Sequence, residues 1–140
     1  MAIQPLAITA CTATNALGRG LPASLAALRR GESGLRPCDF EDAAVATWIG
    51  RVAGLEDEPL RDEFAAFDCR NNRLARLGLE QDGFAAAVAA ARARYGADRI
   101  GVFVGTSTSG IGATEQAYRR RDPSTGALPA SFDYQHTHNV

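Results

Sequence analysis

Apolar runs and glycine- or proline-containing turns alternate along the chain. Runs rich in β-branched residues predict strands at Ile3–Cys11, Thr47–Val52 and Arg99–Val104. The last of these passes directly into a loop of small residues, Gly105–Gly112. A buried strand that ends in such a loop is a common place for the wall of a binding site.

Apolar residues recur every three or four positions in other stretches, which predict helices. Leucines at helical spacing over Leu21–Leu28, followed by Gly31, predict a short helix with a glycine stop. The stretch Asn72–Tyr95 predicts a long helix, although Gly78 and Gly83 weaken it locally.

Polar and glycine-containing stretches separate these elements. A last helix is expected over Ala113–Arg120, after the glycine loop. The segments expected as turns or loops are Asn15–Gly18, Glu32–Ala44, Gly54–Pro59 and Arg119–Gly126. Strands that alternate with helices indicate a layered α/β fold.

The composition is that of a globular domain. The chain has 140 residues, of which 46% are hydrophobic, enough for one domain with a core. Fifteen Lys and Arg against 16 Asp and Glu give a net charge of -1, so no global field favours nucleic acid. Because the start of the chain has no basic leader and no run reaches membrane-spanning length, we expect a cytoplasmic protein without membrane insertion.

The cysteines and histidines predict no metal site. Cys11, Cys38 and Cys69 are widely spaced and form no C-x-x-C pair, so each is expected to be reduced and buried. His136 and His138 form an H-x-H pair that could face one side of a strand. Two imidazoles without further ligands do not complete a zinc site.

The glycine loop lacks the spacing of known phosphate-binding loops. Gly105, Gly110 and Gly112 follow neither the G-x-G-x-x-G pattern nor a pattern that ends in Gly-Lys-Ser/Thr. A small stand-alone α/β module that binds a phosphate or nucleotide at this loop remains the alternative from a different functional class.

Three arginines stand at the start of the predicted long helix. Arg70, Arg73 and Arg76 are spaced three apart, so they lie along one face and form what we call the arginine ridge. Positive charge at a helix N-terminus opposes the helix dipole, which suggests a purpose other than helix stability. An acidic protein partner would fit the ridge, while a plain solvated surface is the other interpretation.

Taken in order, several segments resemble the N-terminal part of the β-ketoacyl-acyl carrier protein synthases. The opening strand ending Ile8-Thr-Ala10, the turn Asn15–Gly18 and the helix and turn over Leu25–Leu35 are similar to the first elements of that family. Arg99–Gly112 resembles its strand and glycine-rich loop, and Asn139 matches a recurrent asparagine of the following segment. The resemblance spans the chain.

The resemblance implies a thiolase-like layered α/β/α fold, of which residues 1–140 would be a single incomplete domain from the N-terminal half. It implies an acyltransferase that performs a decarboxylative Claisen condensation of acyl and malonyl carrier protein thioesters in fatty acid, polyketide or polyene biosynthesis. No cofactor is implied. The implied partners are an acyl carrier protein and either a second synthase subunit in a homodimer or a chain-length factor in a heterodimer.

The resemblance also implies that the catalytic residues lie elsewhere. The nucleophile of the family stands in a Thr/Ser-Ala-Cys motif beyond the Asn139 segment, and the catalytic histidines lie further on. None of the cysteines of this chain occupies that motif, and His136 and His138 are not the catalytic pair. We therefore expect a catalytically silent N-terminal fragment, with a non-catalytic chain-length partner as the alternative within the family.

Substrate-binding residues are implied at the glycine loop and near the end of the chain. Thr108 matches the gating position of the loop, with Gly105 and Gly110 in the same wall, and His138 falls where a side chain reaches the acyl pocket of the partner subunit. Both Thr108 and His138 are polar where apolar residues are common. This difference favours a polar or aromatic-primed substrate over a long saturated acyl chain.

The arginine ridge is implied as the docking surface for the acidic carrier protein. Arg70 and Arg73 match basic positions of the family, and Arg76 continues the ridge. A fragment that lacks the neighbouring strands would also leave a sheet edge and an apolar face uncovered, so we expect self-association or dependence on further polypeptide.

Overall fold

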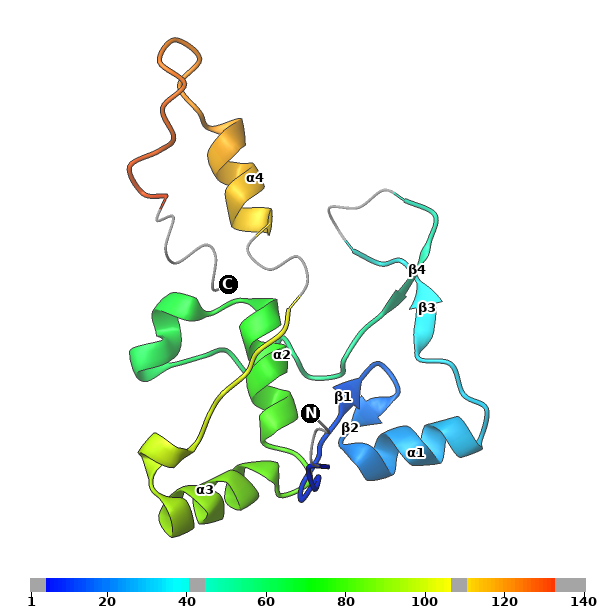
Figure 1. Ribbon diagram of the computed structural model, residues 1–140. Coiled ribbons are helices and arrows are strands. Elements are labelled where there is room, and N and C mark those ends of the chain that lie inside the picture. The colour runs from blue at the N-terminus through cyan, green and yellow to red at the C-terminus, as the bar shows by residue number, and fades with distance from the viewer. Residues whose placement is uncertain (1–4, 41–44, 107–110, 133–140) are drawn as a thin grey trace. The chain divides into compact units, whose positions relative to one another are not determined.

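The computed structural model describes residues 5–40, 45–106 and 111–132. Contacts divide the chain into two compact units, one formed by Met1–Asp57 with Leu74–Gly101 and one by Glu58–Arg73 with Val102–Val140. The described residues combine helices with two small antiparallel sheets (Figure 1). A mixed α/β composition is therefore confirmed.

The first sheet of the first unit is a tight hairpin. β1 (Thr14–Asn15) pairs with β2 (Gly18–Arg19), with Asn15 opposite Gly18. The Leu17 N–H donates to the Asn15 side-chain oxygen at 2.8 Å, which closes the turn. The turn predicted at Asn15–Gly18 is confirmed.

The second sheet pairs two segments that are distant in sequence. β3 (Leu35–Pro37) is antiparallel to β4 (Trp48–Gly50), with Arg36 opposite Ile49. β4 confirms the middle of the strand predicted at Thr47–Val52. The loop predicted over Glu32–Ala44 is wrong at β3, because that strand depends on a distant partner rather than on a local apolar pattern.

Gly34 and Gly50 leave room for Ala16, which lies in the turn of the first hairpin. A Cβ added at Gly34 would lie 2.7 Å from the Ala16 carbonyl carbon, and one added at Gly50 would lie 2.9 Å from the Ala16 Cβ. Real side chains do not approach so closely, so both positions need glycine for the observed packing.

The helix α1 (Leu21–Arg29) confirms the short helix predicted there. Gly20 precedes it with a φ of 84° and provides no side-chain cap. Instead the Leu21 N–H donates to both carboxylate oxygens of Asp82, at 3.1 and 2.9 Å. Thr12 Oγ1 lies 2.9 Å from the same carboxylate and 3.0 Å from the Gly78 carbonyl oxygen, so these two acceptors share its single proton. A residue far away in sequence therefore caps α1.

The long helix predicted over Asn72–Tyr95 is two helices. α2 (Arg70–Leu79) and α3 (Phe84–Tyr95) are separated by a turn in which Asp82 has a φ of 55° and Gly83 a φ of 69°. Left-handed backbone conformations cannot continue a right-handed helix. The prediction of one continuous helix is wrong at this turn, where Asp82 instead reaches the start of α1.

The strand predicted at Ile3–Cys11 does not form over its described residues. No regular secondary structure is assigned between residues 5 and 13. Leu6 and Ile8 expose 92% and 86% of their surface. An apolar pattern gives a strand only where a neighbouring strand completes the hydrogen-bond ladder, and no described segment pairs with this one.

The strand predicted at Arg99–Val104 is also wrong. Residues Ala97–Arg99 form a short 3₁₀-helix, and the backbone is extended at Ile100, with φ -106° and ψ 113°. Val102, Phe103 and Val104, which we call the exposed apolar segment, have 81%, 97% and 84% of their surface exposed. Among the described residues nothing forms a backbone hydrogen bond with this segment.

The second unit contains the other described helices. A 3₁₀-helix at Asp62–Phe67 leads to the start of α2, and α4 (Ile111–Arg119) confirms the helix predicted after the glycine loop. The polar turn predicted next is formed around Asp122. Its carboxylate accepts the Ser124 and Thr125 backbone N–H groups at 2.7 and 2.9 Å. The hydrogen bond from the Ser124 hydroxyl, followed by these two backbone bonds, lowers the pKa of Asp122 to about 2.

Few of the described apolar side chains are buried. In the described part of the chain, the buried apolar residues are Ala27, Leu55, Leu60, Leu77 and Ala117. None of the helices described is long and apolar enough to cross a membrane.

Candidate functional site

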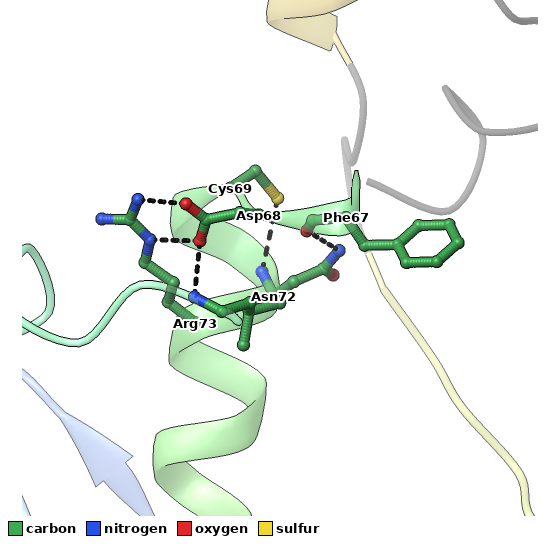
Figure 2. Close-up of polar contacts among 6 residues, drawn as sticks. Phe67, Asp68, Cys69, Asn72 and Arg73 are labelled. Atoms are coloured by element: carbon green, nitrogen blue, oxygen red, sulfur yellow. Dashed lines mark hydrogen bonds and ion pairs between the residues drawn. The ribbon is translucent and has the colours of Figure 1, made fainter. Parts of the chain in front are cut away.

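The clearest cluster of charged side chains lies where α2 begins. The Arg73 guanidinium forms two parallel bonds with the Asp68 carboxylate, from Nε to Oδ1 and from Nη2 to Oδ2, each 2.6 Å long. Figure 2 shows the two guanidinium nitrogens facing the two carboxylate oxygens. The Arg73 side chain is 19% exposed and the Asp68 side chain 23% exposed, so the pair is partly shielded from water. This is the strong, bidentate form of an arginine–carboxylate pair.

Asp68 has a second role at the same place. Its Oδ1 also accepts the Leu60 backbone N–H at 2.9 Å. The hydrogen bonds from Arg73 and then from Leu60 lower the pKa of Asp68 to about 2, against a smaller opposite effect of burial. The same pairing raises the pKa of Arg73. Both groups are therefore charged throughout the physiological range.

Residues beside this pair cap the first turn of α2. The Arg73 N–H donates to the Cys69 carbonyl at 2.9 Å, and the Asn72 N–H donates to the Cys69 sulfur at 3.5 Å. The Asn72 side-chain amide donates to the Phe67 carbonyl at 2.9 Å (Figure 2). These bonds tie Phe67 and Cys69, the two neighbours of Asp68 in the chain, to the first turn of α2.

The arginine ridge accordingly contains its own acidic partners. Arg76 pairs with Glu80 at 2.9 Å, one helical turn later, in an exposed ion pair. Arg70, the first residue of α2, is half-buried. The carboxylate of Asp68 just before the helix offsets the unfavourable placement of cations at the positive end of the helix dipole.

Sequence reasoning named the cations and missed the carboxylates. The Arg76–Glu80 spacing of four residues is a recognisable helical ion pair and could have been found. The Asp68–Arg73 spacing of five has no such signature, because Asp68 lies before the helix and reaches Arg73 from the preceding turn.

The substrate-binding residues predicted at the glycine loop are mostly outside the described residues. Gly105 is described and exposed, whereas Thr108, Gly110 and His138 lie outside, as does His136. Gly112 falls within α4. The structure therefore neither gathers these residues nor separates them.

The cysteines are free thiols, as predicted, but they are not buried. Cys11 is exposed, and Cys38 and Cys69 are half-buried. The expectation of interior cysteines is wrong because their neighbouring segments contribute little to the small cores. In the described ranges, no three His, Cys, Asp or Glu side chains are grouped as a metal site would require.

No family model, no curated protein and no solved structure matches this chain.

Proposed function

We propose that this chain is the N-terminal part of a β-ketoacyl-acyl carrier protein synthase. The proposal rests on the ordered resemblance of the segments Ile8–Ala10, Asn15–Gly18, Leu25–Leu35 and Arg99–Gly112 to that family. In this proposal residues 1–140 belong to a thiolase-like layered domain and contribute part of the acyl pocket, with Thr108 at its gate.

The observation that best supports the proposal is the exposed apolar segment. Val102, Phe103 and Val104 are consecutive, so an extended backbone directs apolar side chains to both of its faces. Strands that are apolar on both faces are typical of sheets covered by helices on either side. A layered α/β/α domain needs such a strand, followed by a loop at its carboxyl end.

The arginine ridge supports a carrier protein as the partner. Arg70 and Arg73 stand at the start of α2, where guanidinium groups can meet an acidic protein surface. Attraction between opposite charges mainly accelerates the encounter of two proteins and fixes their orientation. Docking of an acyl carrier protein would use both effects.

The chemistry of such a synthase requires groups that this chain does not provide. A cysteine thiolate attacks the acyl thioester, takes the acyl group and releases the carrier thiol. The malonyl thioester then loses carbon dioxide, and its carbanion attacks the enzyme thioester to form the 3-oxoacyl product and free the cysteine. Backbone amides stabilise the oxyanion of each addition. This chain supplies walls and docking surface, and by itself is expected to be catalytically silent.

The coding sequence beyond Val140 tests the proposal. A Thr/Ser-Ala-Cys motif followed by two histidines is expected there, and the longer protein should convert acyl and malonyl carrier thioesters to a 3-oxoacyl thioester. Replacing that cysteine by alanine should abolish the product. Glutamine at that position would indicate the chain-length partner. An open reading frame without the motif would contradict membership of the family.

The second candidate is a phosphate- or nucleotide-binding module. The small residues between Gly105 and Gly112 favour it, since backbone amides in such loops can surround an anion. Specific nucleotide binding by this chain, measured by titration and lost in Gly110→Val, would support the module. If the unmodified chain and the Gly110→Val variant bind nucleotide equally weakly, the nucleotide-binding module is excluded.

A further inference from the structure

The Asp68–Arg73 pair changes the charge that the arginine ridge presents. Asp68 contacts both the Nε and the Nη2 atoms of Arg73 at 2.6 Å, so the charge of this guanidinium is matched by an adjacent carboxylate. The pKa of about 2 keeps that carboxylate ionised. An approaching acidic protein therefore meets a neutral pair at this position rather than a cation.

The position of Asp68 is fixed independently of Arg73. The Leu60 N–H binds the same carboxylate, and the bonds from Asn72 to Phe67 and to Cys69 hold the chain on either side. Asp68 is therefore not a mobile surface carboxylate that an incoming partner can easily displace.

We infer that Asp68 is an affinity-setting residue, which weakens the binding of an acidic carrier protein to the arginine ridge by neutralising Arg73. The inference rests on the proposed docking of a carrier protein. Its physical consequence is reversible binding. A carrier protein that visits a synthase repeatedly has to leave it, and a net positive charge at Arg73 would slow its departure.

Charge-changing variants that keep the side-chain shape test this inference. Asp68→Asn retains an oxygen that can accept the Leu60 N–H but removes the negative charge beside the Arg73 guanidinium. Arg73→Gln leaves Asp68 unopposed instead. The double variant restores a neutral pair, and Asp68→Glu retains the negative charge as a control.

Binding is measured by fluorescence anisotropy with a labelled holo-acyl carrier protein at several salt concentrations. At low salt we expect Asp68→Asn to bind about 3- to 10-fold more tightly than the unmodified chain, with a steeper salt dependence. Arg73→Gln should bind more weakly by a similar factor, whereas the double variant and Asp68→Glu should resemble the unmodified chain. Circular dichroism checks that each variant keeps its helix content.

The outcomes distinguish this inference from the docking proposal. If Asp68→Asn keeps its helices but binds no more tightly than the unmodified chain, while Arg70→Gln still weakens binding, the role of Asp68 is overturned and docking stands. If none of the variants alters binding, the ridge is not the docking surface and the inference falls with it. A double variant much weaker than the unmodified chain would show that Arg73 contacts the carrier protein directly despite Asp68, which also overturns the inference.

Discussion

Two parts of the molecule, one polar and one apolar, differ in whether the described residues supply all the partners that each part needs. Around Asp82, in what we call the Asp82 hub, Thr12 and Leu21 bind one carboxylate and fasten the start of α1 to the turn between α2 and α3. The exposed apolar segment, Val102–Val104, has the composition of a core strand and yet is more than four-fifths exposed.

The difference shows what each kind of interaction requires. The Asp82 hub needs only three groups, because one carboxylate accepts hydrogen bonds from one hydroxyl and one backbone N–H. An apolar strand gains stability only when neighbouring strands and helices cover its edges and faces. Its completion requires a much larger surface than the described residues bring to it.

Replacing the centre of the exposed apolar segment should have the largest effect. Phe103→Lys replaces an aromatic side chain that is 97% exposed by a charged one, and should strongly reduce self-association of the chain, because charge opposes edge-to-edge strand pairing. Sedimentation velocity over a range of concentrations measures the change. Val88→Lys, at an exposed valine on α3, is the matched control and should leave self-association unchanged. If both variants self-associate equally, the exposed apolar segment is not the surface through which the chain self-associates.

The packing of Ala16 against glycine should be the next most sensitive feature. Gly34→Ala places a methyl group against the Ala16 backbone and should destabilise the first unit by about 1–3 kcal/mol. Gly78→Ala is the matched comparison, since its added Cβ would meet Thr14 at an ordinary 3.8 Å inside a helix. It should be neutral or stabilise by up to about 1 kcal/mol. Urea unfolding followed by circular dichroism measures both, and a Gly34→Ala protein as stable as Gly78→Ala would contradict the packing.

Removing the carboxylate of the Asp82 hub should have a smaller effect. Asp82→Ala removes the acceptor for Leu21 N–H and for Thr12, and should cost about 1 kcal/mol, the usual cost of losing an N-cap. Asp57→Ala, at an exposed aspartate in a turn, should cost less than half of this. The urea midpoints of the two variants give the comparison. If both midpoints shift equally, Asp82 does not cap α1.

The smallest effect concerns acid titration of Asp68. Its pKa of about 2 in the folded chain is below the ordinary value near 4, so its pairing with Arg73 stabilises the fold fully above about pH 4. That contribution is lost as the pH falls from about 4 to about 2. Carboxyl ¹³C chemical shifts should show Asp68 titrating near pH 2, and Arg73→Gln should raise its midpoint. A midpoint near 4 in both proteins would show that the ion pair does not form in solution.

The sequence predicted best those elements whose signals are local. The leucine spacing predicted α1, the turn predicted at Asn15–Gly18 is the turn of the first hairpin, and the predicted helix end at Tyr95 is the end of α3. The break at Asp82 was only half visible, since Gly83 indicated weakness but nothing local shows that Asp82 caps a helix sixty-one residues away in sequence. The β3 strand was missed for the same reason, because its partner lies beyond a long loop.

The candidate site was predicted in part. Arg70, Arg73 and Arg76 were identified from helical spacing, and α2 begins at Arg70, two residues before the predicted start at Asn72. Asp68 was missed because the charge it neutralises is five residues away, across the start of the helix. Residue type and spacing can predict where charge is placed along a helix, but only the three-dimensional turn shows which charges are already paired.

Amide hydrogen exchange of the chain, at concentrations where sedimentation shows a monomer, most directly tests the contrast between the Asp82 hub and the exposed apolar segment. The Ser24 amide, which bonds to the Gly20 carbonyl in the first turn of α1, should be protected together with the rest of that helix. The amides of Val102, Phe103 and Val104 should exchange as fast as in an unstructured peptide. Protection of those three amides in the monomer would contradict the account, because it would show that the chain completes this strand by itself.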